Sequence, residues 1–144
     1  MPKFALAAAA ALAFTLSAAF APADAETVKY KADLAGPGEV PPNDSKGTGT
    51  IEASLDAETK TLTWSGSYSG LTGPELAAHF HGPAKAGVNA PVLVPVEAKA
   101  SPFSGSATLT DAEAQDFADV LVYFNIHTDA HKGGEIRGQL ATAP

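Results

Sequence analysis

Short stretches in which apolar and polar residues alternate constrain this chain more than any other feature. From Val28 to Leu34 every second residue is apolar and the residues between them are charged, and residues 48–55 and 61–68 follow a similar period of two. Successive side chains of a strand point to opposite faces, so this period predicts strands with one buried face. Gly and Pro, which favour turns, separate the stretches. An antiparallel sheet is therefore expected.

The same pattern, continued along the chain, predicts about eight short strands. They fall at residues 27–34, 48–55, 61–68, 77–81, 91–96, 103–109, 120–127 and 135–140. Pro95 cannot donate a ladder hydrogen bond, which indicates an edge strand or a bulge. The tail after Leu140 is expected to fray. The predicted fold class is all-β: one antiparallel Greek-key β-sandwich or barrel.

One helix interrupts the strands. Thr110 and Glu113 have the spacing of a capping box, in which each side chain satisfies a backbone amide of the other residue. The segment that follows is rich in alanine and acidic residues up to Asp119. A short surface helix is expected there.

The first 25 residues have the pattern of a secretory signal peptide. Lys3 precedes an apolar run from Phe4 to Phe20, and Ala23-Asp24-Ala25 forms a small-x-small cleavage site. An uncleaved membrane anchor is the alternative, but the run is short for a bilayer span. The sequence thus predicts a single mature domain, residues 26–144, that is periplasmic or secreted and has no membrane association after cleavage.

Charge and cysteine content exclude several classes of function. The formal net charge is −7, whereas nucleic acids and anionic membrane surfaces bind clustered Lys and Arg. The chain has no cysteine, which excludes disulfides and thiolate metal sites. A metal ion would have to bind His, Asp, Glu or backbone oxygen.

The four histidines of the chain lie in two short segments. His79 and His81 are two residues apart, which in a strand places them on one face with Cα atoms roughly 6.6 Å apart. His127 ends a predicted strand, and His131 lies in the loop beyond it. If the two strands are neighbours, three or four imidazoles meet. An all-nitrogen site suits Cu(II) or Zn(II), and copper is the stronger binder. The alternative is that these are loop histidines that bind no metal.

Other polar residues near these segments have weaker signals. Glu135 and Arg137 share a face of the last predicted strand, where they could form an ion pair or orient a histidine. Asp129 is either a carboxylate ligand or a solvated loop acid. Trp64 and Tyr68 are expected in the core.

Four motifs carry a resemblance to a known family. They are GPGEVPP at residues 36–42, AAHFHGPA at 77–84, NIHT at 125–128 and GGEIRGQL at 133–140. With them the chain resembles the CHRD domain, a module first described in chordin and widespread in exported bacterial proteins. The resemblance implies an immunoglobulin-sized β-sandwich and, from the animal proteins, binding to other extracellular proteins. His131 departs from the family, which more often has asparagine there.

A looser resemblance links the H-x-H motif and the distant histidine to copper-zinc superoxide dismutase, although this chain lacks the cysteine pair and long zinc loop of that enzyme. It implies copper held by His79, His81 and His127, with His131 as a fourth or a solvent-side ligand. A copper-dependent dismutase would use Arg137 to attract the anion, whereas a closed shell would store or transfer copper. The rival hypothesis is a non-enzymatic interaction or adhesion module with structural histidines. The oligomeric state is left open.

Overall fold

The computed structural model describes residues 26–144, so the predicted signal peptide at residues 1–25 lies outside the described part of the chain. The described elements are β1 (Thr27–Ala35), the 3-10 turn η1 (Gly36–Gly38), β2 (Thr48–Asp56), β3 (Thr61–Ser69), β4 (Glu75–His81), β5 (Val92–Val96), β6 (Phe103–Thr108), α1 (Asp111–Ala118), β7 (Tyr123–Thr128), β8 (Ile136–Gln139) and β9 (Ala141–Ala143).

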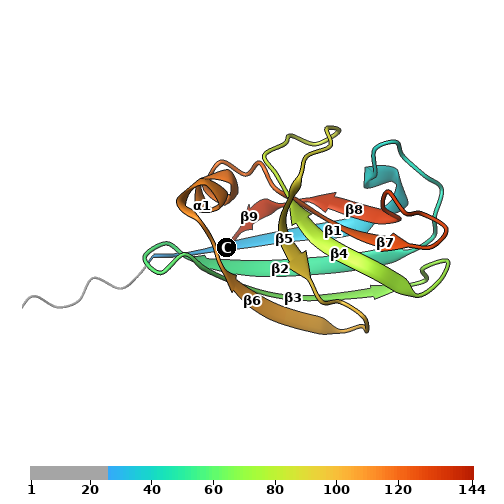
Figure 1. The fold of residues 1–144 in the computed structure, drawn as a ribbon, viewed down its shortest axis with the longest axis horizontal. Helices are drawn as coiled ribbons and strands as arrows, with labels where there is room; N and C mark the ends of the chain where they lie inside the picture. The colour runs from blue at the N-terminus through green and yellow to red at the C-terminus, as the bar shows by residue number, and fades with distance from the viewer. Residues whose placement is uncertain (1–25) are drawn as a thin grey trace, which may run out of the picture.

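The strands form one antiparallel sheet in the order β5-β4-β7-β8-β1-β2-β3-β6. Figure 1 shows this sheet curled into a nearly closed barrel, with α1 at one end. The predicted all-β antiparallel fold is confirmed. β5, which contains Pro95, lies at one edge of the sheet, and its pairing with β4 shifts register between Phe80 and His81. Pro95 was thus a correct indicator of an edge strand.

The expectation that the tail after Leu140 frays was wrong. β9 pairs with the first half of β1, with Lys31 opposite Ala141 and Lys29 opposite Ala143. β8 reaches β1 only at the Arg137–Ala35 pair, which leaves the rest of that side of β1 without a partner. Unpaired N–H and C=O groups on a strand edge are a ready template for another strand. The last residues of the chain satisfy them.

Aromatic side chains fill the interior of the barrel. Phe80 is fully buried, and its ring centroid lies 4.9 Å from that of Phe124, 5.6 Å from Trp64 and 5.7 Å from Phe117. Most of these contacts are tilted or edge-to-face, as aromatic pairs prefer. Trp64 is in the core as predicted, while Tyr68 packs against the core from a partly buried position.

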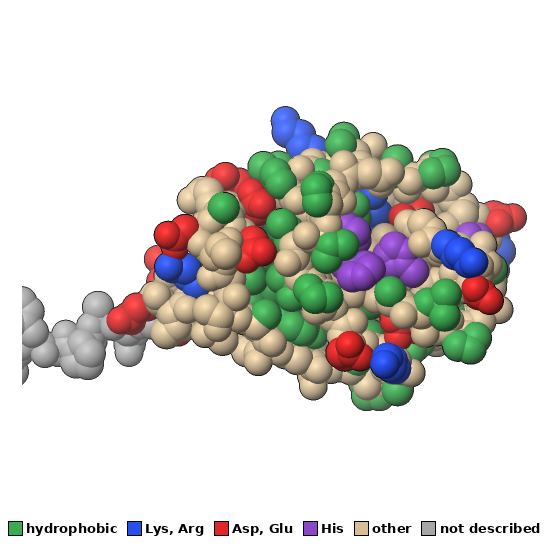
Figure 2. Space-filling view, in the orientation of Figure 1, with side chains coloured by type: hydrophobic (Ala, Val, Ile, Leu, Met, Phe, Trp, Pro, Cys, Tyr) green, Lys and Arg blue, Asp and Glu red, His purple; other side chains and the backbone are tan. Residues whose placement is uncertain are grey.

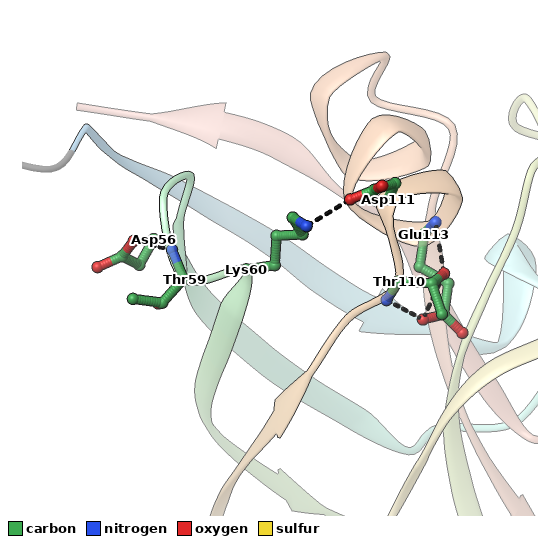
Figure 3. A network of polar contacts seen from close by, with 6 residues as sticks. All are labelled: Asp56, Thr59, Lys60, Thr110, Asp111 and Glu113. Atoms are coloured by element: carbon green, nitrogen blue, oxygen red, sulfur yellow. Dashed lines mark hydrogen bonds and ion pairs between the residues drawn. The ribbon is translucent and has the colours of Figure 1, made fainter.

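Contacts on both the exposed and the buried side of α1 hold the helix against the barrel. Thr110 and Glu113 form the predicted capping box, and Lys60 from the β2–β3 turn forms an ion pair with Asp111 in the first helical turn (Figure 3). Phe117 on the opposite side is fully buried. The helix therefore caps the barrel rather than lying loosely on its surface. Within residues 26–144, no helix combines the length and apolarity that a bilayer span requires.

A buried carboxylate joins the segment before β2, the β3–β4 connection and the end of β7. Glu135 has no exposed surface, and its two oxygens accept hydrogen bonds from Ser45 Oγ (2.6 Å), Thr72 N (2.9 Å), Thr72 Oγ1 (2.9 Å) and Thr128 Oγ1 (2.6 Å). Burial acts to raise the pKa of Glu135, but these hydrogen bonds outweigh it and hold the pKa below its usual value. The predicted ion pair between Glu135 and Arg137 is not formed among the described residues.

Candidate metal centre

The pairing of β4 with β7 brings the two histidine segments together. His79 lies opposite Asn125, and Ala77 lies opposite His127. Because Phe80 points into the core, His79 and His81 both point to the outer face of the sheet. Figure 2 shows the histidine side chains gathered at the surface of this face. The sequence prediction that strand pairing unites the two segments is confirmed for these three histidines.

The three imidazoles stand close enough to share one ion. One ring nitrogen from each of His79, His81 and His127 can be chosen so that all three atoms lie within 4.8 Å of one another. His79 Nδ1 and His127 Nε2 are 3.1 Å apart. Metal–nitrogen bonds of about 2.0–2.1 Å place adjacent ligand atoms about 2.8–3.4 Å apart and opposite ones about 4.2 Å apart. The close pair already has ligand spacing; a pair 4.8 Å apart must close by roughly half an ångström to bind at opposite positions and by roughly 1.4 Å to bind at adjacent ones.

Backbone carbonyls fix the orientation of two of these rings. His81 Nδ1 lies 2.9 Å from the Ala90 carbonyl oxygen, and His127 Nδ1 lies 2.9 Å from the Lys132 carbonyl oxygen. A carbonyl oxygen only accepts, so the proton of each neutral ring sits on Nδ1 and its Nε2 keeps the lone pair. His127 Nε2 faces His79 Nδ1 at 3.1 Å, and His81 Nε2 faces Asn125 Oδ1 at 3.0 Å. Histidines that bind metals are usually oriented in this way by a partner on their other nitrogen.

The surroundings of His79 and His81 favour neutral imidazoles. Burial lowers the pKa of His79 to about 4, with smaller contributions from His127 and His81. Burial also lowers the pKa of His81, against the opposing effect of its hydrogen bond to Ala90. Near neutral pH the nitrogens of these two rings therefore keep their lone pairs, which a metal ion requires.

The lowered pKa of His79 predicts a separate titration for that ring. In the metal-free protein, the Cε1–H NMR resonance of His79 should titrate with a midpoint near pH 4, well below the ordinary histidine value of about 6.5. A His79→Gln variant identifies the resonance by removing it. A midpoint above pH 6 would contradict the burial that the structure shows for this ring.

Arg137 holds the segment that covers His81. Its guanidinium donates to Asn89 Oδ1 (2.9 Å) and to the Val88 carbonyl oxygen (2.6 Å), and its Cζ lies 3.4 Å from the centre of the Tyr123 ring. That ring in turn stacks on the imidazole of His81, with centroids 4.8 Å apart and planes within 5°. Arg137 is only 3% exposed. These contacts describe a positioning residue, since an anion in solvent has little access to the guanidinium.

Two further residues of the site had no role in the sequence prediction. Asn125 is 2% exposed and its Oδ1 lies 3.0 Å from His81 Nε2, while Glu39 is 4% exposed and accepts a hydrogen bond from Asn125 Nδ2 (3.3 Å). Both belong to motifs of the family resemblance, NIHT and GPGEVPP. Their place in those motifs was the signal that could have identified them.

His131 and Asp129 lie outside the histidine group. β7 ends at Thr128, and a turn closed by hydrogen bonds between the backbones of Thr128 and His131 carries the chain past the end of the sheet. His131 lines a surface hollow of about 320 Å³ together with Glu39. Asp129 is exposed and faces Lys132, at 3.8 Å. The structure does not bring His131 to the position of a fourth ligand.

Comparison with known proteins gives one match. The model of the family described as CHRD domain matches residues 30–140. No curated protein and no solved structure matches the chain. The looser resemblance to copper-zinc superoxide dismutase gains no support from these comparisons.

Proposed function

This chain belongs to the CHRD-domain family, and on that premise we propose that it is an exported metal-binding member that holds one copper ion through His79, His81 and His127. The orientation of the rings carries the proposal. His81 and His127 each have Nδ1 engaged by a backbone carbonyl, which directs Nε2 towards other residues of the site: His127 Nε2 towards His79 and His81 Nε2 towards Asn125. Histidines that only hold loops in place would not need to direct their second ring nitrogens towards the same site.

Copper is the ion that this donor set favours. The site offers imidazole nitrogen and no thiolate, which suits Cu(II) and Zn(II), and Cu(II) binds more tightly to a given nitrogen site. Zinc is the second candidate. The signal-peptide pattern of residues 1–25 supports a periplasmic or secreted location for the protein.

Two activities are compatible with such a site. A redox-active copper ion with a free coordination position would supply superoxide dismutation. An ion with every position filled by the protein would instead be stored or transferred. The number of protein ligands decides between them.

Metal binding is tested by equilibrium dialysis of the purified protein against Cu(II) and Zn(II) at neutral pH. We expect one equivalent of copper in the wild type. His79→Ala/His81→Ala should lower the affinity at least about a hundredfold, because two of three strong ligands are lost. His131→Ala is the matched control, since it removes a histidine outside the group, and it should bind like the wild type.

If the wild type holds no stoichiometric metal, or the double variant binds as well as the wild type, the metal proposal fails. The protein would then be better explained as an interaction module. With copper bound, a superoxide assay separates the two activities. Turnover above that of free copper supports the dismutase, and its absence leaves a carrier.

A further inference from the structure

The outer face of the sheet presents a fourth side chain beside the three histidines. His79 on β4 lies directly opposite Asn125 on β7, while His81 lies opposite Tyr123 and His127 opposite Ala77, so Asn125 is a diagonal neighbour of His81 on this face. Building on the proposed metal site, we infer that Asn125 Oδ1 is the fourth ligand of the ion and that Glu39 holds the amide in the orientation this requires.

The first support is the contact between Asn125 Oδ1 and His81 Nε2. The two atoms are 3.0 Å apart. Since His81 Nδ1 donates to the Ala90 carbonyl oxygen, Nε2 of the neutral ring is an acceptor, and Asn125 Oδ1 is an acceptor too. Two acceptors at this distance have no hydrogen between them, but a cation satisfies both. The separation also fits two adjacent ligands of one ion, about 2.8–3.4 Å apart.

The second support is the partner of the amide nitrogen. Asn125 Nδ2 donates to Glu39 Oε1 at 3.3 Å. An ionised carboxylate only accepts hydrogen bonds, so it holds the NH₂ group on its own side and directs the carbonyl oxygen towards His81. Burial raises the pKa of Glu39, while the hydrogen bond from Asn125 and the positive charge of Arg137 act in the opposite direction, and a cation at the centre would further favour the ionised form.

Gly134 shows how tightly this amide is enclosed. Its φ of +129° is one that side-chain-bearing residues rarely adopt, and an added Cβ would lie 2.6 Å from Glu39 Cδ and 2.7 Å from Asn125 Nδ2. The glycine therefore does more than form a turn. It lets the backbone pack directly against the carboxylate and the amide, and both side chains are more than nine-tenths buried.

A rival arrangement uses the same residues with the amide reversed. Burial raises the pKa of Glu39, and a protonated Glu39 could donate to Asn125 Oδ1 while Nδ2 donates to His81 Nε2. In that arrangement the N–H group of Asn125 occupies His81 Nε2, the nitrogen that the ion needs, so Asn125 is not a ligand. The two arrangements differ in whether an oxygen or an N–H at position 125 faces the site.

The experiment exchanges the two polar groups. Asn125→Leu removes the oxygen, and Asn125→Asp/Glu39→Gln moves the carboxylate to position 125 and the amide to position 39, which retains their hydrogen bond. Copper affinity is measured by competition titration, and the ligand set is followed by Cu(II) EPR. We expect Asn125→Leu to weaken binding roughly tenfold to a hundredfold. The exchanged variant should bind at least as tightly as the wild type, with a shifted EPR spectrum, because a carboxylate oxygen replaces the amide oxygen.

The outcomes separate this inference from the metal site itself. Absence of metal in the wild type would contradict both the metal site and the fourth ligand. Metal binding by the wild type together with an unchanged affinity and EPR spectrum in Asn125→Leu would overturn only the fourth ligand. Tighter copper binding by Asn125→Leu than by the wild type would favour the reversed amide, because the substitution then frees His81 Nε2. If Asn125→Leu fails to fold, the exchanged variant alone decides.

Discussion

Replacing Glu135 by leucine is expected to lower the free energy of unfolding by about 2–4 kcal/mol. The substitution removes the acceptor of four hydrogen bonds, from a half-buried donor of Ser45, two donors of the exposed Thr72 and the buried hydroxyl of Thr128. Each buried polar group that loses its partner costs about 1–3 kcal/mol. Urea unfolding at pH 7 measures the change. A loss below about 1 kcal/mol would show that the three segments hold together without the carboxylate.

Glu135→Gln is the control for the charge of this group. It keeps the shape and one acceptor oxygen, so we expect a smaller loss, about 1–3 kcal/mol. The folded protein holds the pKa of Glu135 below its unfolded value. The charge therefore contributes its full stability above the unfolded pKa of about 4.3, and the contribution is lost as the pH falls through the folded pKa. The difference between wild type and Glu135→Gln should accordingly narrow as the pH is lowered below about 4.

Replacing Phe80 by alanine is expected to destabilise the protein by about 3–5 kcal/mol, as is usual for large-to-small changes at buried aromatic positions. The side chain is fully buried and touches the rings of Trp64, Phe117 and Phe124, which come from β3, α1 and β7. Its loss thus leaves a cavity where the helix and two parts of the sheet meet.

Phe80→Leu is the matched variant, because it keeps most of the apolar volume and should cost clearly less than the alanine. Chemical denaturation of both proteins without metal gives the comparison. Equal losses in the two variants would mean that the site collapses around the smaller side chain. The measurement also bears on the metal centre, since Phe80 anchors the strand that carries His79 and His81.

Much of the fold could be predicted because strands and helix ends produce patterns among residues that are close together in the sequence. The period of two identifies inward and outward side chains, as for Ile51 and Leu55, and the capping box at Thr110 marks the start of the helix. β9 could not be predicted this way. The sequence Ala141–Ala143 has no strong strand pattern, and it pairs only because β8 leaves part of β1 unpaired.

The candidate site was predictable in part for the same reason. The H-x-H spacing places His79 and His81 on one face of any strand, but the position of His131 depends on a turn whose direction the histidine spacing does not encode. Asn125 and Glu39 have no spacing signal, because they are 86 residues apart in the chain and meet only through tertiary packing.

The contacts of Arg137 depended on tertiary packing as well. Its place two residues after Glu135 suggested a pair, yet Glu135 precedes β8 and accepts from Thr72 and Thr128, while Arg137 lies over Tyr123. The partner of a polar side chain depends on the elements that pack around it. Those elements come from distant parts of the chain.

The pairing of β1 with β8 and β9 has a consequence for the order of events in folding. β2 follows β1 and pairs with it locally, and β3 then pairs with β2, but the other side of β1 waits for residues 136–143. Closing the long loop between β1 and these residues costs chain entropy before any contact compensates for it, and this cost slows folding. The barrel can therefore close only late, after the C-terminal residues are available, and a chain that lacks them would keep an open strand edge exposed to other molecules.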